Sequence, residues 1–406
     1  MQRSAAADKA LAGGIGPWRA VLAGLAATLV GIGLARFAYT PLLPALIEAD
    51  WFSASDAAYL GAANLAGYLA GALLGRPLAA RAPAPLLLRA MLLLATAAFF
   101  ACAVPFSFAW FFVWRFASGL AGGALMVLAA PTVLPHVPAA RQGLAGGLIF
   151  TGVGLGIAAS GTLVPLLLRW GLAETWVCLG VLSLALTLLA WGGWPAVPAG
   201  ARIVELRRPR PKGAALATLY VEYGLNAVGL VPHMVFLVDF VARGLGQRLD
   251  IGAAYWVVFG IGAIGGAVLA GALADRIGFK ATLRLAFAVQ ALSVAVLAVT
   301  DGVVALVLSS LIIGAFVPGV VPLVLGRVRE LVPDPSRQQV AWSFATAAFA
   351  LGQAGAAYGF SFLFASGIGY GTLFALGAAA LVLALALDLA VAGTATTPRK
   401  PRGVKR

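Results

Sequence analysis

The sequence predicts an all-α integral membrane protein with twelve transmembrane helices in two pseudo-symmetric six-helix bundles. Of its 406 residues, 62% are hydrophobic and only 10% are charged, whereas soluble domains average about 25% charged residues. Its apolar runs of about 20 residues or more are long enough to cross ~30 Å of hydrocarbon as helices. The run AGALLGR at 70–76 returns as AGALADR at 270–276, and self-similarity at half the chain length is typical of secondary transporters.

The basic residues set the predicted orientation. A formal net charge of +14 would suggest a nucleic-acid partner in a soluble chain. Here most Lys and Arg residues fall in the terminal segments and in alternate loops, and the opposite loops hold only Arg169, Arg243 and Arg248. By the positive-inside rule both termini are cytoplasmic and the number of spans is even. We therefore expect the lipid bilayer, and no nucleic acid, as the partner of this charge.

The apolar runs divide the chain into four parts. Residues 1–194 form an N-terminal bundle and residues 214–391 a C-terminal bundle, joined by a basic, Pro-rich cytoplasmic linker at 195–213 and followed by a basic tail at 392–406. The predicted spans are 18–47, 55–75, 85–104, 107–134, 142–168, 174–194, 214–241, 251–273, 281–299, 303–326, 338–365 and 368–391. Because eleven runs follow it, the first is interpreted as a span rather than a cleaved signal peptide.

Charged and polar residues within the first four spans are candidates for a transport pathway. Arg36 lies in the outer half of the first span, followed by Tyr39, and an intramembrane charge is costly unless it faces a partner or a watery cavity. A snorkelling arginine that reaches the outer headgroups is the alternative. The second span carries Asn64, and the fourth carries Arg115 about two turns from the outer face.

The seventh span is the most polar. Glu222, Asn226 and His233 share one helical face, because they are 4 and 11 residues apart along the chain. An acid and an imidazole on one intramembrane stripe indicate a functional site. The alternatives are a neutral, hydrogen-bonded Glu222 and a packing role for His233.

The remaining spans add an aromatic stripe and a glycine pattern. In the eleventh span, one face carries Trp342, Thr346, Phe349 and Gln353. Glycines gather in spans 2, 5, 8 and 11, where small residues let helices approach closely, while spans 3, 6, 9 and 12 are the plainest. We therefore expect a cavity lined by spans 1, 4 and 7, an interface built by the glycine-rich spans, and lipid-facing support from the others. Cys102 and Cys178 lie within apolar runs, so neither suggests a disulfide.

These features resemble the major facilitator superfamily. The run GALADRIGFK at 271–280 matches its loop motif G-x-L-x-D-R-x-G-x-K at every signature position, at the junction of spans 8 and 9. The matching residues are Gly271, Leu273, Asp275, Arg276, Gly278 and Lys280. The first-half copy keeps Gly71 and Arg76, but Gly75 stands where the acid belongs. The resemblance implies a cytoplasmic gate that breaks and reforms between states, with both partners present only in the second half.

Two further motifs narrow the resemblance. Arg115 to Gly119 is similar to the fourth-span motif R-x-x-x-G, which implies a role for Arg115 in proton coupling. Gly152, Gly156 and Gly161 match part of the antiporter motif of span 5, but Ile157 replaces its proline. The run GLARFAYTPLLP in span 1 resembles the YbfB/YjiJ-like bacterial branch of the superfamily.

The sequence therefore predicts a proton-coupled secondary transporter, monomeric and multi-pass, in a bacterial inner membrane. It would move a small organic solute by alternating access, with Arg36 and Arg115 anchoring an anionic group or setting the electric field in the cavity. Glu222 would carry the proton, because burial disfavours its charged form. One alternative is a drug/proton antiporter that exports amphipathic compounds, and a remote one is a receptor or scaffold. Since no nucleophile–base set, Walker motif or Cys/His metal cluster appears in the sequence, we expect no enzyme, metal or cofactor.

Overall fold

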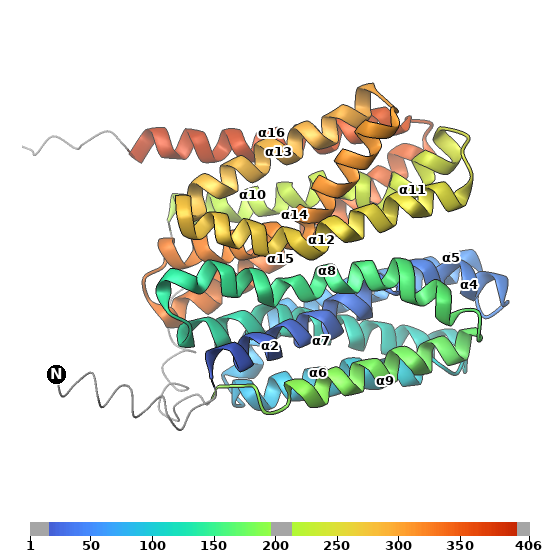
Figure 1. Cartoon of the computed structure of the whole chain (residues 1–406), viewed down its shortest axis with the longest axis horizontal. Helices are drawn as coiled ribbons and strands as arrows, with labels where there is room; N and C mark the ends of the chain where they lie inside the picture. Colours follow the sequence, from blue (N-terminus) through green and yellow to red (C-terminus); the bar gives the residue numbers. More distant parts are fainter. Residues whose placement is uncertain (1–15, 196–212, 396–406) are drawn as a thin grey trace, which may run out of the picture.

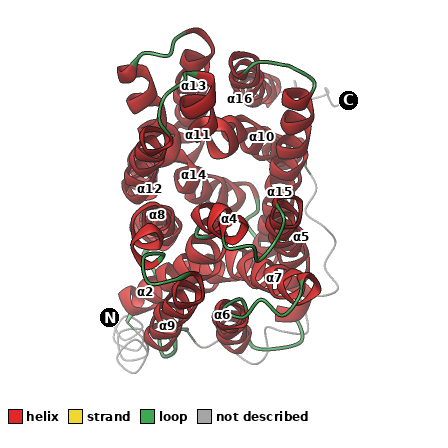
Figure 2. Ribbon diagram, turned by 90° about the vertical axis from the view of Figure 1, so that its right-hand side faces the viewer, coloured by secondary structure: helices red, strands yellow, loops and turns green. Residues whose placement is uncertain are grey.

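The computed structural model describes residues 16–195 and 213–395, and the described chain is helical throughout, without strands. The predicted linker and tail therefore lie largely outside the described residues. Helices cover the predicted spans because a lipid-exposed backbone must satisfy its hydrogen bonds internally. The helices of residues 16–195 form one half of the molecule and those of residues 213–395 the other, as Figures 1 and 2 show.

The first half contains six long helical segments. The first predicted span forms α2 (Pro17–Thr28), the π-helical turn η1 (Leu29–Leu34), α3 (Ala35–Phe37) and α4 (Tyr39–Glu48). The others are α5 (Ala54–Ala79), α6 (Ala84–Ala101), α7 (Phe108–Val133), α8 (Gln142–Leu167) and α9 (Leu172–Ala190), with the short turns η2 (Leu134–His136) and η3 (Ala139–Arg141) before α8. The hydroxyls of Ser53 and Ser107 cap α5 and α7. They accept hydrogen bonds from the backbone amides of Asp56 and Trp110, respectively, each at 3.1 Å.

The second half repeats this order. Its first span comprises α10 (Ala214–Val231), η5 (Pro232–Phe236), α11 (Leu237–Asp239) and η6 (Phe240–Gly244). It continues with α12 (Leu249–Ile277), α13 (Phe279–Val299), α14 (Val303–Leu331), α15 (Pro335–Ala365) and α16 (Tyr370–Ala395). The π-helical turns η1 and η5 begin at Leu29 and Pro232, close to the 200-residue offset of the sequence repeat. The internal symmetry therefore extends to a local irregularity of the backbone.

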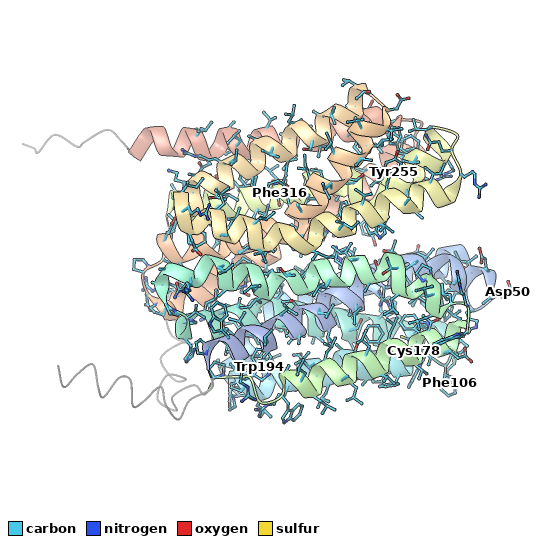
Figure 3. All side chains as sticks on the ribbon, viewed as in Figure 1. Asp50, Phe106, Cys178, Trp194, Tyr255 and Phe316 are labelled. Carbon is cyan, nitrogen blue, oxygen red and sulfur yellow. The ribbon has the colours of Figure 1, made fainter. Side chains whose placement is uncertain are left out.

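Eleven helical segments of the described chain are long and apolar enough to cross a membrane. α5 occupies the second predicted span but is not one of these eleven segments, so twelve spans remain a prediction. Both described ends of the chain lie at the same end of the molecule (Figure 1), which we call the terminal end. In Figure 3, Asp50 and Phe106 mark the opposite, far end.

The two halves meet along the glycine-rich helices, as the sequence pattern predicts. The main pairs are α8 with α12 and α5 with α15. Smaller contacts join α14 to α8 and α7 to α15. A Cβ on Gly154 of α8 would lie 2.0 Å from the carbonyl oxygen of Ala263 in α12, and one on Gly147 would lie 2.4 Å from that of Ala267. Only glycine permits this backbone approach between the halves.

Candidate functional site

A carboxylate joins the two halves at their terminal end. Asp275, near the end of α12, accepts hydrogen bonds from the backbone amides of Gly143 at 2.9 Å and Leu144 at 2.8 Å. These amides open α8, where the first turn lacks intrahelical acceptors and the helix dipole favours negative charge. Gly271 allows the approach, because a Cβ there would lie 2.2 Å from the carbonyl oxygen of Gly143. Asp275 thus caps a helix of the opposite half.

The other residues of this motif lie around the turn that follows. Gly278 separates α12 from α13 with φ +87° and ψ 153°, a conformation that side chains with a Cβ rarely adopt. Arg276 is exposed beside it and Lys280 is half-buried. The glycine therefore makes the sharp turn that leaves Asp275 facing α8.

The first-half copy of the motif is arranged differently. A Cβ on Gly71 would lie 2.0 Å from the carbonyl oxygen of Leu120 in α7, so this glycine serves packing within its own half. Arg76 lies in the last turn of α5. The link between halves at this crossing comes from Ser343 of α15, whose hydroxyl donates to the carbonyl oxygen of Ala72. A serine hydroxyl thus makes the contact on this side, where the motif lacks its acid.

An aromatic cluster extends this closure inward. Trp342, fully buried, donates its indole N–H to the carbonyl oxygen of Met126 in α7 at 3.0 Å. Its ring lies 6.3 Å from that of Tyr223 and 6.5 Å from that of Phe150, and Tyr223 contacts Phe349 at 4.7 Å. Aromatic rings of both halves therefore pack together near the terminal end. Thr346 is buried on the same helix and donates to the carbonyl oxygen of Trp342.

Arg36 reaches across to the other half. Its guanidinium donates to the side-chain oxygen of Gln353 in α15 and lies 5.5 and 5.8 Å from the ring centroids of Phe37 and Tyr68. Gln353 also approaches the sulfur of Met234 at 3.2 Å. By helix rise, Gln353 is ~27 Å from the start of α15, so this crossing is nearer the far end. Arg36 faces the opposite half rather than the headgroups.

Arg115 lies elsewhere, inside the first half. It is 3% exposed, donates to the carbonyl oxygen of Ala35 at 2.8 Å and lies 4.1 Å above the ring of Tyr39. Asn64 donates to the hydroxyl of Ser118 at 2.9 Å and to the backbone oxygen of Arg115 at 3.2 Å. Tyr39 donates to the carbonyl oxygen of Ala57 at 2.8 Å. The contacts of Arg115, Asn64 and Tyr39 among the described residues are therefore within one half.

The stripe on α10 faces the interior of the second half. His233 shares a 2.7 Å hydrogen bond with Ser309, whose hydroxyl also donates to the carbonyl oxygen of Ser293. Asn226 donates to Gln290 at 2.9 Å. Glu222 is 2% exposed, and no hydrogen bond of its carboxyl group is found within residues 16–195 and 213–395. The charged groups that act on it come from α13, α14 and α16: Lys280, Arg284, Arg327 and Asp388.

The structure thus separates the predicted site residues into three places. One crossing between the halves contains Arg36 and Gln353, with the aromatic cluster of Trp342 and Phe349 closer to the terminal end. The other predicted pathway residues lie within single halves, whereas Asp275 and Gly271 of the motif meet α8 of the opposite half at the terminal end. The prediction omitted Ser343, Gly143 and Tyr68, whose roles depend on a neighbouring helix that no local motif reveals. Among the described residues, no group of three or more His, Cys, Asp or Glu side chains could hold a metal ion.

Comparisons with known proteins agree with this architecture. Residues 28–389 match the family model described as "uncharacterised MFS-type transporter YbfB". The fold is similar to that of the human organic anion transporter MFSD10, with a TM-score of 0.74, 16% identity, and coverage of 92% of this chain and 99% of that one. The proton:xylose symporter XylE gives a TM-score of 0.73 at 16% identity, covering 92% and 95% of the two chains.

The transporter FucP, in its outward conformation, gives a TM-score of 0.70 at 16% identity, with 91% and 97% of the two chains covered. At such identities these structures are evidence for the fold alone. A search of curated protein sequences finds no match.

Proposed function

Because the chain belongs to the YbfB family of the major facilitator superfamily, as the motif in its first span predicts, we propose that it is a proton-coupled secondary transporter. It moves a small organic solute across a bacterial inner membrane by alternating access. The main observation that supports this proposal is the hydrogen bond from Arg36 of one half to Gln353 of the other. A solute bound there touches both halves, so its binding can bias their relative position.

Arg36 anchors the solute in this proposal. An arginine presents five donors in a planar fork that suits a carboxylate, and the guanidinium of Arg36 donates here to the neutral side-chain oxygen of Gln353. An anionic group can replace that oxygen and gain a charge-assisted hydrogen bond. The rings of Tyr68 and Phe37 beside the guanidinium suit an apolar body attached to the anionic group.

Glu222 carries the proton in this proposal. Its carboxyl group is buried in the second half, away from the crossing at Arg36, and the next residue, Tyr223, faces the aromatic cluster between the halves. A carboxylate that gains or loses charge in a poorly hydrated site changes its interaction with Arg284, Arg327, Lys280 and Asp388. Any shift of α10 that follows moves Tyr223 against Trp342, and this couples the proton to the closure at the terminal end.

The test begins with a ligand found by thermal-shift screening of the purified chain against metabolites and drugs at two pH values. In liposomes, Glu222→Gln should bind that ligand but lose the dependence of its transport on the proton gradient. Glu48→Gln is the control, because Glu48 is an exposed carboxylate at the end of α4, in the other half. Unaltered dependence on the proton gradient in Glu222→Gln would reject the role of Glu222.

Arg36→Gln tests the anchor in the same assay. Loss of a hydrogen bond between a charged pair costs about 1.5–3 kcal/mol, so the apparent affinity for an anionic ligand should fall by about 10- to 150-fold. A neutral ligand should bind the variant about as well as the parent. Equal affinity of parent and variant for an anionic ligand would show that Arg36 does not bind its anionic group.

A second candidate function is export of amphipathic drug-like compounds. The observation in its favour is the cluster of Phe150, Tyr223, Trp342 and Phe349 between the halves. A deletion strain that becomes sensitive to a panel of toxic amphipathic compounds would favour this function over transport of a nutrient or metabolite.

A further inference from the structure

A small cavity lies within the first half, apart from the crossing at Arg36. It is lined by residues of α3, α6, α7 and α9, together with Cys102, which follows α6, and its volume is about 10 Å³, roughly what one water-sized ligand needs. Most of its wall is apolar, and its polar lining includes Arg115, Ser118 and Trp176. The cavity therefore admits a single-atom or water-sized ligand and excludes a carboxylate or a phosphate.

Two buried N–H donors belong to residues of this wall and find no acceptor within residues 16–195 and 213–395. The Nε atom of Arg115 and the Nε1 atom of Trp176 are both buried, and neither has a hydrogen-bond partner in the part of the chain that the structure describes. Arg115 uses its Nη1 atom to donate to Ala35, and Trp176 is 1% exposed. A buried donor without an acceptor costs about 1–3 kcal/mol, so both groups favour a ligand that accepts hydrogen bonds.

No acid among the described residues compensates the charge of Arg115. The titratable side chains that act on it are Tyr39 and Cys102, and neither is an acid that is ionised at neutral pH. Its nearest ring is the face of Tyr39 at 4.1 Å, a weaker partner than an anion. A buried arginine without an anionic partner is strongly destabilising, so a negative charge in the cavity would offset that cost.

We propose that this cavity binds one halide ion, chloride under physiological conditions. A halide accepts from both Arg115 and Trp176, neutralises the guanidinium and has no hydrogen atoms that need acceptors. A water molecule could accept the same two bonds, but it would leave the charge uncompensated. The wall also includes the ring of Phe99, whose positive edge would suit an anion. Arg115 lies seven residues after the start of α7, roughly 10 Å from the far end, so the ion would enter from that end.

The test measures thermal unfolding of the full-length purified chain by circular dichroism. Sodium chloride replaces sodium gluconate at constant ionic strength, so charge screening stays the same. A ligand that binds the folded state raises the unfolding temperature with its concentration. We expect that rise to saturate, to be reproduced by bromide, and to require about tenfold more halide in Trp176→Phe, which lacks one donor to the ion.

Trp256→Phe is the matched control, because Trp256 is another buried indole whose Nε1 has no acceptor among the described residues, in α12 of the other half. It should respond to halide as the parent does, and anomalous diffraction should place bromide beside Arg115. An unfolding temperature independent of halide, or an equal response of Trp176→Phe and the parent, would overturn the proposal and leave a water molecule as the occupant. Neither result depends on transport, so the inference can fail without the proposed function.

Discussion

Removing the charge of Asp275 should loosen the closure at the terminal end. In Asp275→Asn, one side-chain oxygen remains to accept an amide of α8, so one of the bonds to Gly143 and Leu144 is lost. The favourable interaction of the charge with the dipole of α8 is also lost, worth about 0.3–1 kcal/mol at an exposed position. Because Asp275 is exposed, we take the low end of the hydrogen-bond range, and expect a total of about 1–2 kcal/mol. That corresponds to a change of about 5- to 30-fold in the ratio of closed to open molecules.

The assay is pulsed electron–electron double resonance between two spin labels. The labels are attached to cysteines that replace Arg81 and Pro333, which are exposed in loops of opposite halves. Both native cysteines are replaced by serine so that only these positions carry labels. Asp239→Asn is the control, because Asp239 pairs with Arg243 within the second half. Asp275→Asn should increase the population of long distances, and Asp239→Asn should leave it unchanged. Distance distributions identical to the parent in Asp275→Asn would refute the idea that this carboxylate holds the two halves together.

Two further substitutions test the contacts between the halves. Gly154→Ala should weaken the pairing of α8 with α12 by about 1–3 kcal/mol, because its Cβ would lie 2.0 Å from the carbonyl oxygen of Ala263. The control is Gly265→Ala, because Gly265 has no neighbour outside its own helix within 4 Å, and the unfolding of the two variants is compared in mild detergent. If both variants unfold alike, the contact between α8 and α12 is not tightly packed. Trp342→Phe should cost about 0.5–1.5 kcal/mol by removing the hydrogen bond to Met126 and should lengthen the spin-label distances slightly; a variant as closed as the parent would show that ring packing alone maintains this contact.

The family and the helices follow from the sequence because their signals are local. A run of apolar residues must become a helix in lipid wherever its neighbours lie. Likewise Gly278 is recognisable because the turn after α12 needs a conformation that glycine adopts readily. The glycine pattern also predicts the interface, since close approach of two backbones requires small residues along a whole helix face. These properties need no knowledge of the partner helix.

The direction that each polar face takes was decided by the tertiary structure. Periodicity predicts that Glu222, Asn226 and His233 share one face, and the structure directs that face to the interior of the second half, where His233 meets Ser309. In the same way Arg36 and Arg115 are both intramembrane arginines in the sequence, yet one meets Gln353 of the opposite half and the other remains inside its own. A period of 3.6 residues determines which side chains lie together on a helix. The neighbour that this face meets depends on how each helix is rotated in the bundle, and that rotation is set by packing against every other helix at once.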